Sequence, residues 1–226
     1  MADLAARLSA IDEEIADAAR AVGRNVDEIT RIVVTKFHPA SLVRDLYALG
    51  VRDVGENRQQ ELTAKRAEIS LDGLRWHFIG QAQTKKAGAI RRDADAVHSV
   101  DRIKLADALH RVAEPDARLD VLVQVNLTDD QGRGGAEPSE VSHLVEHILG
   151  LPSLRLRGIM GVAPLGEEPR PAFERLHRIG AEIRALEPGA TWMSAGMTGD
   201  FADAIAAGAT HLRIGSAITG PRPDRG

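Results

Sequence analysis

The chain has 226 residues, of which 43% are hydrophobic and 27% are charged, as is usual for a globular protein with a sizeable core. Its net charge of −4 comes without a basic block, which argues against nucleic-acid binding, and the absence of cysteine excludes disulfides, thiolate metal ligands and a cysteine nucleophile. No signal-peptide pattern and no apolar run of membrane-spanning length is visible, so we expect a cytoplasmic protein without membrane contact.

The first predicted element is an amphipathic helix over residues 3–22, where apolar side chains recur at helical spacing. Beyond it, strand-like apolar runs alternate with helix-like segments. The predicted strands cover residues 31–36, 51–54, 76–79, 96–100, 119–126, 154–160, 191–194 and 211–214. The predicted helices between them cover residues 40–49, 57–69, 83–91, 101–113, 137–149, 168–186 and 199–207, and the last helix falls in the tail after Gly215.

This strict alternation predicts a parallel sheet with helices packed on it. Eight strand–helix units predict a closed (β/α)8 TIM barrel with an additional N-terminal helix, and a doubly wound open sheet is the alternative. No linker divides the chain, so residues 1–226 are expected to form a single domain. Residues 221–226 are expected to be a loose tail.

Polar and small residues gather where the predicted strands end, which is the face of a barrel that carries chemistry. Lys36 ends the first strand, Asn57 follows the second and Asn126 ends the fifth. Ordinary turn formation explains the glycines at these positions, but it explains a lysine and two asparagines less well.

Two glycine-containing stretches follow the last two strands, "MSAGMTGD" at residues 193–200 and "RIGSAITG" at residues 213–220. Backbone N–H groups in such loops can turn toward an anion, and barrels often bind phosphate after strands seven and eight. The alternative is that both stretches are ordinary turns. The sequence therefore predicts a phosphate site without establishing it.

Lys36 admits two interpretations. A lysine at the rim of a barrel can form a Schiff base, especially where burial lowers its pKa. It can also pair with a carboxylate such as that of Glu56. A Schiff-base lysine beside a phosphate site would suit pyridoxal 5'-phosphate (PLP) or a phosphorylated aldehyde substrate.

One stretch resembles a metal-binding motif but is not expected to bind a metal. The stretch "HLVEH" at residues 143–147 matches a zinc pattern, but its histidines and Glu146 fall opposite the apolar face of the predicted helix. We therefore expect His143, Glu146 and His147 to face solvent, and we predict no metal centre.

Taken together, several stretches resemble the pyridoxal phosphate homeostasis proteins of the YggS/PROSC family, in family order from residue 33 to about residue 220. The stretches are "VVTKFHP", "VGENRQQEL", "WHFIGQAQTKKAG", "HSVDR", "VQVNLTDDQGRGG", "LRGIMGVAP", "MSAGMTGDFADAIAAGAT" and "RIGSAITG". The resemblance implies a barrel related to the N-terminal domain of bacterial alanine racemase, with PLP as its cofactor.

The resemblance also implies a set of cofactor-binding residues. Lys36 would hold the aldehyde of PLP as a Schiff base, and Arg213 would face the pyridine nitrogen. Ser194, Gly215 and Ser216 would hold the phosphate. Asn57, His77, Met160 and Gly196 would line the pocket.

The sequence departs from the usual family pattern at several positions. Lys85 stands where asparagine is usual, Ala195 where methionine is common and Thr219 where an aromatic residue is usual. Asp130 and Arg133 replace a glutamate and a lysine. These departures leave the implied cofactor set intact but affect functions that depend on a lid or on surface contacts.

The resemblance implies a PLP carrier in PLP homeostasis, with little or no turnover of its own and no catalytic residues. The lone tyrosine, Tyr47, lies on a predicted outer helix, so a tyrosine base opposite the cofactor is hard to supply. Alternatives are a PLP-dependent amino-acid racemase and a Schiff-base aldolase. Expected partners are PLP and PLP-dependent apoenzymes, and we expect a monomer.

Overall fold

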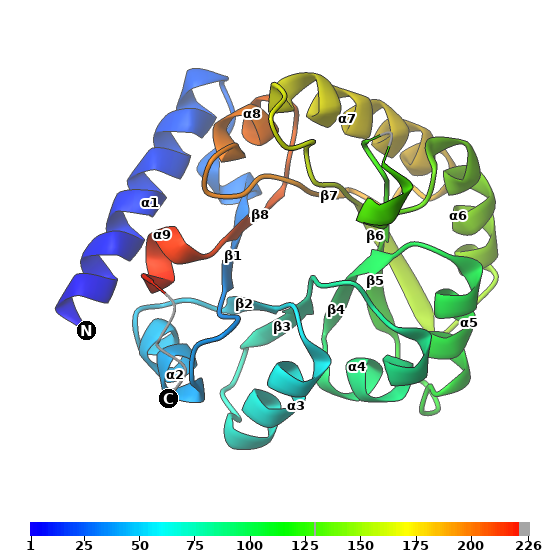
Figure 1. The fold of residues 1–226 in the computed structure, drawn as a ribbon, viewed down its shortest axis with the longest axis horizontal. Coiled ribbons are helices and arrows are strands. Elements are labelled where there is room, and N and C mark those ends of the chain that lie inside the picture. Colours follow the sequence, from blue (N-terminus) through cyan, green and yellow to red (C-terminus); the bar gives the residue numbers. More distant parts are fainter. Residues whose placement is uncertain (129, 222–226) are drawn as a thin grey trace.

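The computed structural model describes residues 1–128 and 130–221. In these residues, parallel strands close into a barrel in the order β1 to β8, each strand lying beside the next along the chain and β8 pairing with β1 (Figure 1). The predicted TIM barrel is confirmed, and the open-sheet alternative is wrong, because an open sheet would leave β1 and β8 unpaired. The expectation of a loose tail over 221–226 concerns residues that, apart from Pro221, lie outside the described part.

The strands match the predicted positions closely. Their bounds are β1 Thr30–Val34, β2 Asp53–Glu56, β3 Arg75–Phe78, β4 Ala96–Val100, β5 Leu119–Gln124, β6 Leu154–Met160, β7 Trp192–Ser194 and β8 His211–Ile214. Most strand residues are buried, because alternate side chains point into the barrel or lie under the outer helices.

Helices alternate with the strands and form the outer layer of the barrel (Figure 1). Their bounds are α1 Ala2–Ala21, α2 Ala40–Ala48, α3 Gln59–Glu68, α4 Ala87–Asp93, α5 Ile103–Arg111, α6 Val141–Leu149, α7 Pro169–Leu186, α8 Phe201–Ala206 and α9 Ser216–Thr219. Short 3-10 helices cover Val26–Glu28, Thr84–Lys86, Gln131–Arg133 and Pro138–Glu140. No helix in the described ranges is long and apolar enough to cross a membrane.

The additional N-terminal helix packs on the closing side of the barrel. Buried side chains of α1 lie at Leu4, Leu8, Ile11, Ile15 and Ala19, a helical spacing that puts them on one face. This face packs against α8 and α9. The helix therefore supports α9, which begins directly after β8 at the carboxyl end of the barrel.

Candidate functional site

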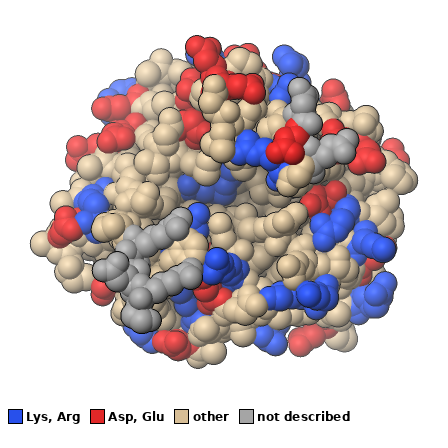
Figure 2. Space-filling model, viewed as in Figure 1, with Lys and Arg blue, Asp and Glu red and all other residues tan. Residues whose placement is uncertain are grey.

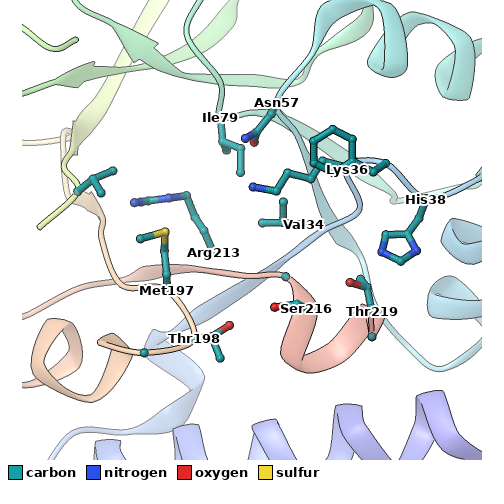
Figure 3. A pocket seen from close by; sticks show the side chains of 15 residues that line it. Val34, Lys36, His38, Asn57, Ile79, Met197, Thr198, Arg213, Ser216 and Thr219 are labelled. Atoms are coloured by element: carbon teal, nitrogen blue, oxygen red, sulfur yellow. The ribbon is translucent and has the colours of Figure 1, made fainter. Parts of the chain in front are cut away.

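A cavity of about 420 Å³ opens at the end of the barrel where β1, β2 and β8 finish; we call this end the mouth and the opposite end the base. Its volume lies within the range of about 300–1,000 Å³ typical of small-molecule sites. Figure 3 shows labelled side chains entering the cavity from several sides. The lining residues are Val34, Lys36, Phe37, His38, Asn57, Ile79, Val162, Met197, Thr198, Gly199, Arg213, Gly215, Ser216, Thr219 and Gly220.

The backbone around Lys36 is fixed on both sides. Lys36 lies two residues after β1, and the preceding Thr35 still donates its N–H to Gly55 O at 3.0 Å. The following Phe37 has a φ of +69°, a left-handed conformation that costs a non-glycine residue roughly 1–2 kcal/mol. Its N–H donates to Glu61 Oε2 at 2.8 Å. This turn holds the Lys36 side chain toward the cavity, where Figure 3 shows it.

Glu56 is not the partner of Lys36. Its carboxylate is buried and accepts from Lys65 Nζ at 2.5 Å and from Thr35 Oγ1 at 2.6 Å. Burial raises the pKa of Glu56, and the Lys65 ammonium opposes that shift. Lys65 also donates to the Thr35 carbonyl at 2.7 Å, so it holds the backbone next to Lys36.

The Lys36 amine makes neither a hydrogen bond nor an ion pair with any residue that the structure describes. The interpretation of Lys36 as an ion-paired lysine is therefore wrong, since its proposed carboxylate is occupied by Lys65. An amine held at the wall of a cavity without a protein partner is available to a ligand. Its geometry suits a carbonyl or anionic group entering the mouth.

Arg213, on β8, places a buried cation at the inner wall of the same cavity. It donates to Ser194 Oγ at 2.8 Å and to the Gly161 carbonyl at 2.9 Å. Burial lowers the pKa of Arg213 to about 10, with Asp200 opposing the shift, so the side chain stays charged at neutral pH. Among the described residues it has no carboxylate within ion-pair distance, and basic side chains occupy the central hollow seen in Figure 2.

A chain of buried hydrogen bonds runs inward from Arg213. Ser194 Oγ lies 2.8 Å from His98 Nδ1, His98 Nε2 lies 2.9 Å from His77 Nδ1, and His77 Nε2 lies 2.9 Å from Asp53 Oδ1. One arrangement of protons satisfies every step: each group donates toward Asp53, from the Arg213 N–H through the Ser194 hydroxyl and both imidazoles. We call these five residues the polar chain.

Burial, with smaller effects from nearby cations, holds the pKa of His98 well below its ordinary value, so His98 is neutral as this arrangement requires. Burial alone would raise the pKa of Asp53, but the bond from His77 and the nearby Arg75 lower it overall. The ionised Asp53 therefore fixes the direction of the donors, and the polar chain fixes the orientation of Arg213.

The loops after β7 and β8 form another wall of the cavity, as barrels with phosphate sites often arrange them. Thr198 and Gly199 come from the first loop, and Gly215 and Ser216 from the second. The first N–H groups of a helix have no partner within it, so the backbone at the start of α9 presents donors here. These donors and the hydroxyl groups nearby are suited to an oxyanion.

The structure brings only part of the predicted set to the cavity: Lys36, Asn57, Arg213, Gly215 and Ser216 line it. His77, Met160 and Ser194 are buried behind the wall, and the Gly196 carbonyl accepts the Arg213 N–H at 2.9 Å. The Ser194 hydroxyl bonds to His98, which leaves no proton for a phosphate in this arrangement. The roles implied for these residues stay predictions, as does the absence of catalytic residues.

Sequence reasoning missed several lining residues. Met197, Thr198 and Gly199 belong to the glycine-containing stretch after the seventh strand, so the signal was present but did not say which residues face inward. Thr219, at a position where the family usually has an aromatic residue, also lines the cavity. Asn126 does not; its side chain bonds to the Thr128 N–H and to the Asp130 carbonyl.

No cluster of three or more potential metal ligands occurs in the part of the chain that the structure describes. In the "HLVEH" stretch, His143 and Glu146 are exposed, as predicted. His147 is only half-buried and lies 2.7 Å from Asp107, which explains its place on the helix without a metal.

Comparisons with known proteins identify relatives of this chain. The sequence pattern of the family described as "Alanine racemase, N-terminal domain" matches residues 7–223. The pyridoxal phosphate homeostasis proteins of Mycobacterium tuberculosis and Escherichia coli K12 are 39% and 37% identical, over 97% and 98% of this chain and 93% and 98% of theirs.

Solved structures show the same barrel. PipY from Synechococcus elongatus, solved with PLP bound, is 34% identical, with a TM-score of 0.84 over 96% of this chain and 100% of its own. An alanine racemase from Clostridium difficile has a TM-score of 0.75 at 15% identity and covers 99% of this chain and 58% of its own, a likeness of fold alone.

Proposed function

This chain belongs to the pyridoxal phosphate homeostasis protein family, and we propose that it binds PLP covalently through the Lys36 amine and carries it in PLP homeostasis, with little or no turnover of its own. The observation that carries the proposal is the juxtaposition at the mouth of the Lys36 amine and the buried Arg213 cation, neither of which has a carboxylate partner among the described residues.

The residues of the cavity fit PLP chemically. The cofactor has an aldehyde, a phosphate and a ring with polar substituents, and the cavity offers an amine, backbone donors at Gly215 and Ser216, and polar side chains. Asn57 Oδ1 is buried and has no hydrogen-bond partner within the described residues, which is unusual for a side-chain oxygen. A donor on a bound ligand would satisfy it.

Bound PLP supplies an electron sink for amino-acid chemistry, and this chain is poorly equipped to exploit it. The permanent cation of Arg213 opposes protonation of a basic nitrogen bound beside it, which weakens such a sink. Lys36 and His38 are the other ionisable side chains that line the cavity, and burial and Lys65 lower the pKa of His38. The Tyr47 hydroxyl donates to the Asp72 carbonyl on the outside of the barrel, away from the mouth.

The carrier function predicts release of PLP to apoenzymes without chemistry on amino acids. Protein loaded with PLP should restore activity to an excess of a PLP-dependent apoenzyme, while its own visible absorbance falls in step. A panel of L-amino acids should give no sustained D-amino acid product. Sustained racemisation would favour the racemase alternative, and a purified protein that traps a phosphorylated carbonyl substrate but does not retain PLP would favour the aldolase.

The proposal extends to the state of the protein in the cell. We propose a cytoplasmic monomer whose mouth stays open to solvent for exchange with apoenzymes. Light scattering coupled to size exclusion should give the mass of one chain, 24.3 kDa. A stable dimer with the mouth at its interface would contradict the exchange function, because apoenzymes could not reach the cavity.

A further inference from the structure

A second cavity, of about 430 Å³, lies at the base of the barrel, where β3, β5, β6 and β7 begin. We call it the basal cavity. It is separated from the mouth by the buried interior of the barrel. Its lining residues are Arg75, Arg91, Ala94, Asp95, Ala117, Arg118, Leu119, Asp120, Arg155, Arg157 and Trp192.

The charge of the basal cavity is opposite in sign to that of the whole chain. Five arginines against two aspartates give its lining a formal charge of +3, whereas the chain carries −4. Both aspartates are already engaged. Asp120 is buried and binds Arg155 Nε at 2.5 Å and Arg75 at 3.2 Å, and Asp95 accepts the Trp76 N–H at 2.7 Å.

Three arginines of the basal cavity have no carboxylate partner within the described residues. Arg91 donates to the carbonyls of Leu109, Ala117 and Ser153, so it ties loops of the base together. Stabilisation of the barrel explains Arg91 and the two arginines on Asp120. It does not explain the remaining pair, Arg118 and Arg157.

Arg157 and Arg118 are the arginines left for a ligand. The Nε atom of Arg157 is buried and has no hydrogen-bond partner among the described residues, and its guanidinium lies 4.6 Å from the centre of the Trp192 ring. Arg118 is exposed at the start of β5 and makes no hydrogen bond or ion pair with the described residues. A buried donor left without an acceptor is costly unless a ligand supplies one.

We propose that the basal cavity binds a small phosphorylated anion with at least two negative charges. Guanidinium groups match the geometry of phosphate oxygens and bind them bidentately. Arg75 and Arg157 lie over the Trp192 ring, so the cavity offers charge rather than a bare aromatic face for a nucleobase. Its concave shape and small volume, in a chain with no basic surface block, favour a small molecule over a nucleic acid.

The chain contains its own reporter for this site. It has two tryptophans; Trp76 is fully buried, whereas Trp192 lines the basal cavity. Titration of the purified protein with inorganic pyrophosphate, followed by tryptophan fluorescence and by calorimetry, should show saturable binding that weakens as salt is added. Trp192→Phe should abolish the fluorescence change but keep the calorimetric signal.

Variants of the arginines test whether pyrophosphate binds in the basal cavity. Arg118→Gln and Arg157→Gln should each raise the pyrophosphate Kd by about tenfold or more, because each removes a charged donor. Arg178→Gln, at an exposed arginine on α7 that makes no hydrogen bond or ion pair with the described residues, should leave the Kd unchanged. Circular dichroism checks the fold of each variant, and exposed Arg118 keeps the test valid if the Arg157 variant unfolds.

Three results would overturn the proposal. These are no saturable binding of pyrophosphate by the wild-type protein, binding that is insensitive to Arg118→Gln, or tighter binding of a single-stranded oligonucleotide than of pyrophosphate through the same arginines. None of them bears on Lys36 or on the mouth, so the inference fails or stands separately from the proposed function.

Discussion

The mouth and the interior of the barrel are built from the same strands but treat their polar groups differently. In the interior, the polar chain from Arg213 to Asp53 pairs each member with the next, at distances of 2.8–2.9 Å. At the mouth, the Lys36 amine and Asn57 Oδ1 have no partner in the described part of the chain.

This difference distinguishes polar groups that stabilise the fold from polar groups that are available to a ligand. Buried polar groups are normally satisfied, so an unsatisfied group that also lines a cavity marks a place where a ligand can supply the partner. Arg213 belongs to both regions, because the polar chain orients it while its other side faces the cavity. The interior therefore orients a residue of the mouth. The stability of the protein should respond differently to substitutions in the two regions and to pH.

The largest effect is expected where a buried pair beside the mouth is broken. Lys65→Met leaves the fully buried Glu56 carboxylate with Thr35 alone, and breaking a buried ion pair costs about 3–5 kcal/mol. Urea unfolding should show this loss, while the exposed Lys104→Met should change stability little. If Lys65→Met lowers the free energy of unfolding by less than about 1 kcal/mol, the Lys65–Glu56 pair does not stabilise the backbone beside the mouth.

The next effect is a fall in stability with falling pH, which comes from the interior. Burial lowers the pKa of His211 to about 3 from an ordinary 6.5, so between these values the unfolded chain binds a proton that the folded chain excludes. Stability due to His211 is complete above pH 6.5, and by pH 5 about 2 kcal/mol of it is lost. His98, whose pKa is also lowered, adds to the fall.

Urea unfolding at pH 7.5 and at pH 5 measures this fall, and His211→Gln is the matched variant. Glu56, whose pKa is raised, acts in the opposite direction, so the difference between wild type and variant isolates the histidine. The variant should lose less stability on acidification than the wild type. Equal slopes for the two proteins would show that His211 is not held neutral by the fold.

The smallest effect on stability is expected at the mouth. Asn57→Ala removes an oxygen that has no partner in the described part of the chain, so the free energy of unfolding should change by roughly 0.5 kcal/mol or less. The Kd for PLP should rise by about two- to tenfold, the usual range for one hydrogen bond. A large stability loss without a change in PLP affinity would assign Asn57 to the fold instead.

Much of this molecule follows from local sequence patterns. Apolar runs bounded by turn residues placed the strands, and the alternation with helices gave the barrel. The position of Lys36 at the mouth follows from the same pattern, because a parallel barrel brings all strand ends of one kind to one face. These features depend on periodicity and neighbours in the chain.

The pairings across the barrel could not be read in this way. His98 and Ser194 are 96 residues apart, and only closure of the barrel brings their side chains together. Lys65 lies on a mostly polar helix, and nothing in the neighbouring sequence indicates that it is buried and pairs with Glu56. The basal cavity likewise gathers arginines from β3, β6, α4 and the residue before β5, each of which looks like an ordinary surface residue in the sequence.

Reduction of the PLP-loaded protein with borohydride, followed by peptide mass spectrometry, shows whether Lys36 is the residue that binds PLP covalently. Borohydride reduces the carbon–nitrogen double bond of a Schiff base to a stable single bond, so the cofactor stays attached to its lysine. Lys65 serves as an internal control because its amine is buried in an ion pair with Glu56. We expect the added mass of the cofactor on the peptide containing Lys36, none on the peptide containing Lys65, and no labelling of Lys36→Ala. Labelling of another lysine in the wild-type protein, or unchanged visible absorbance in Lys36→Ala, would contradict it.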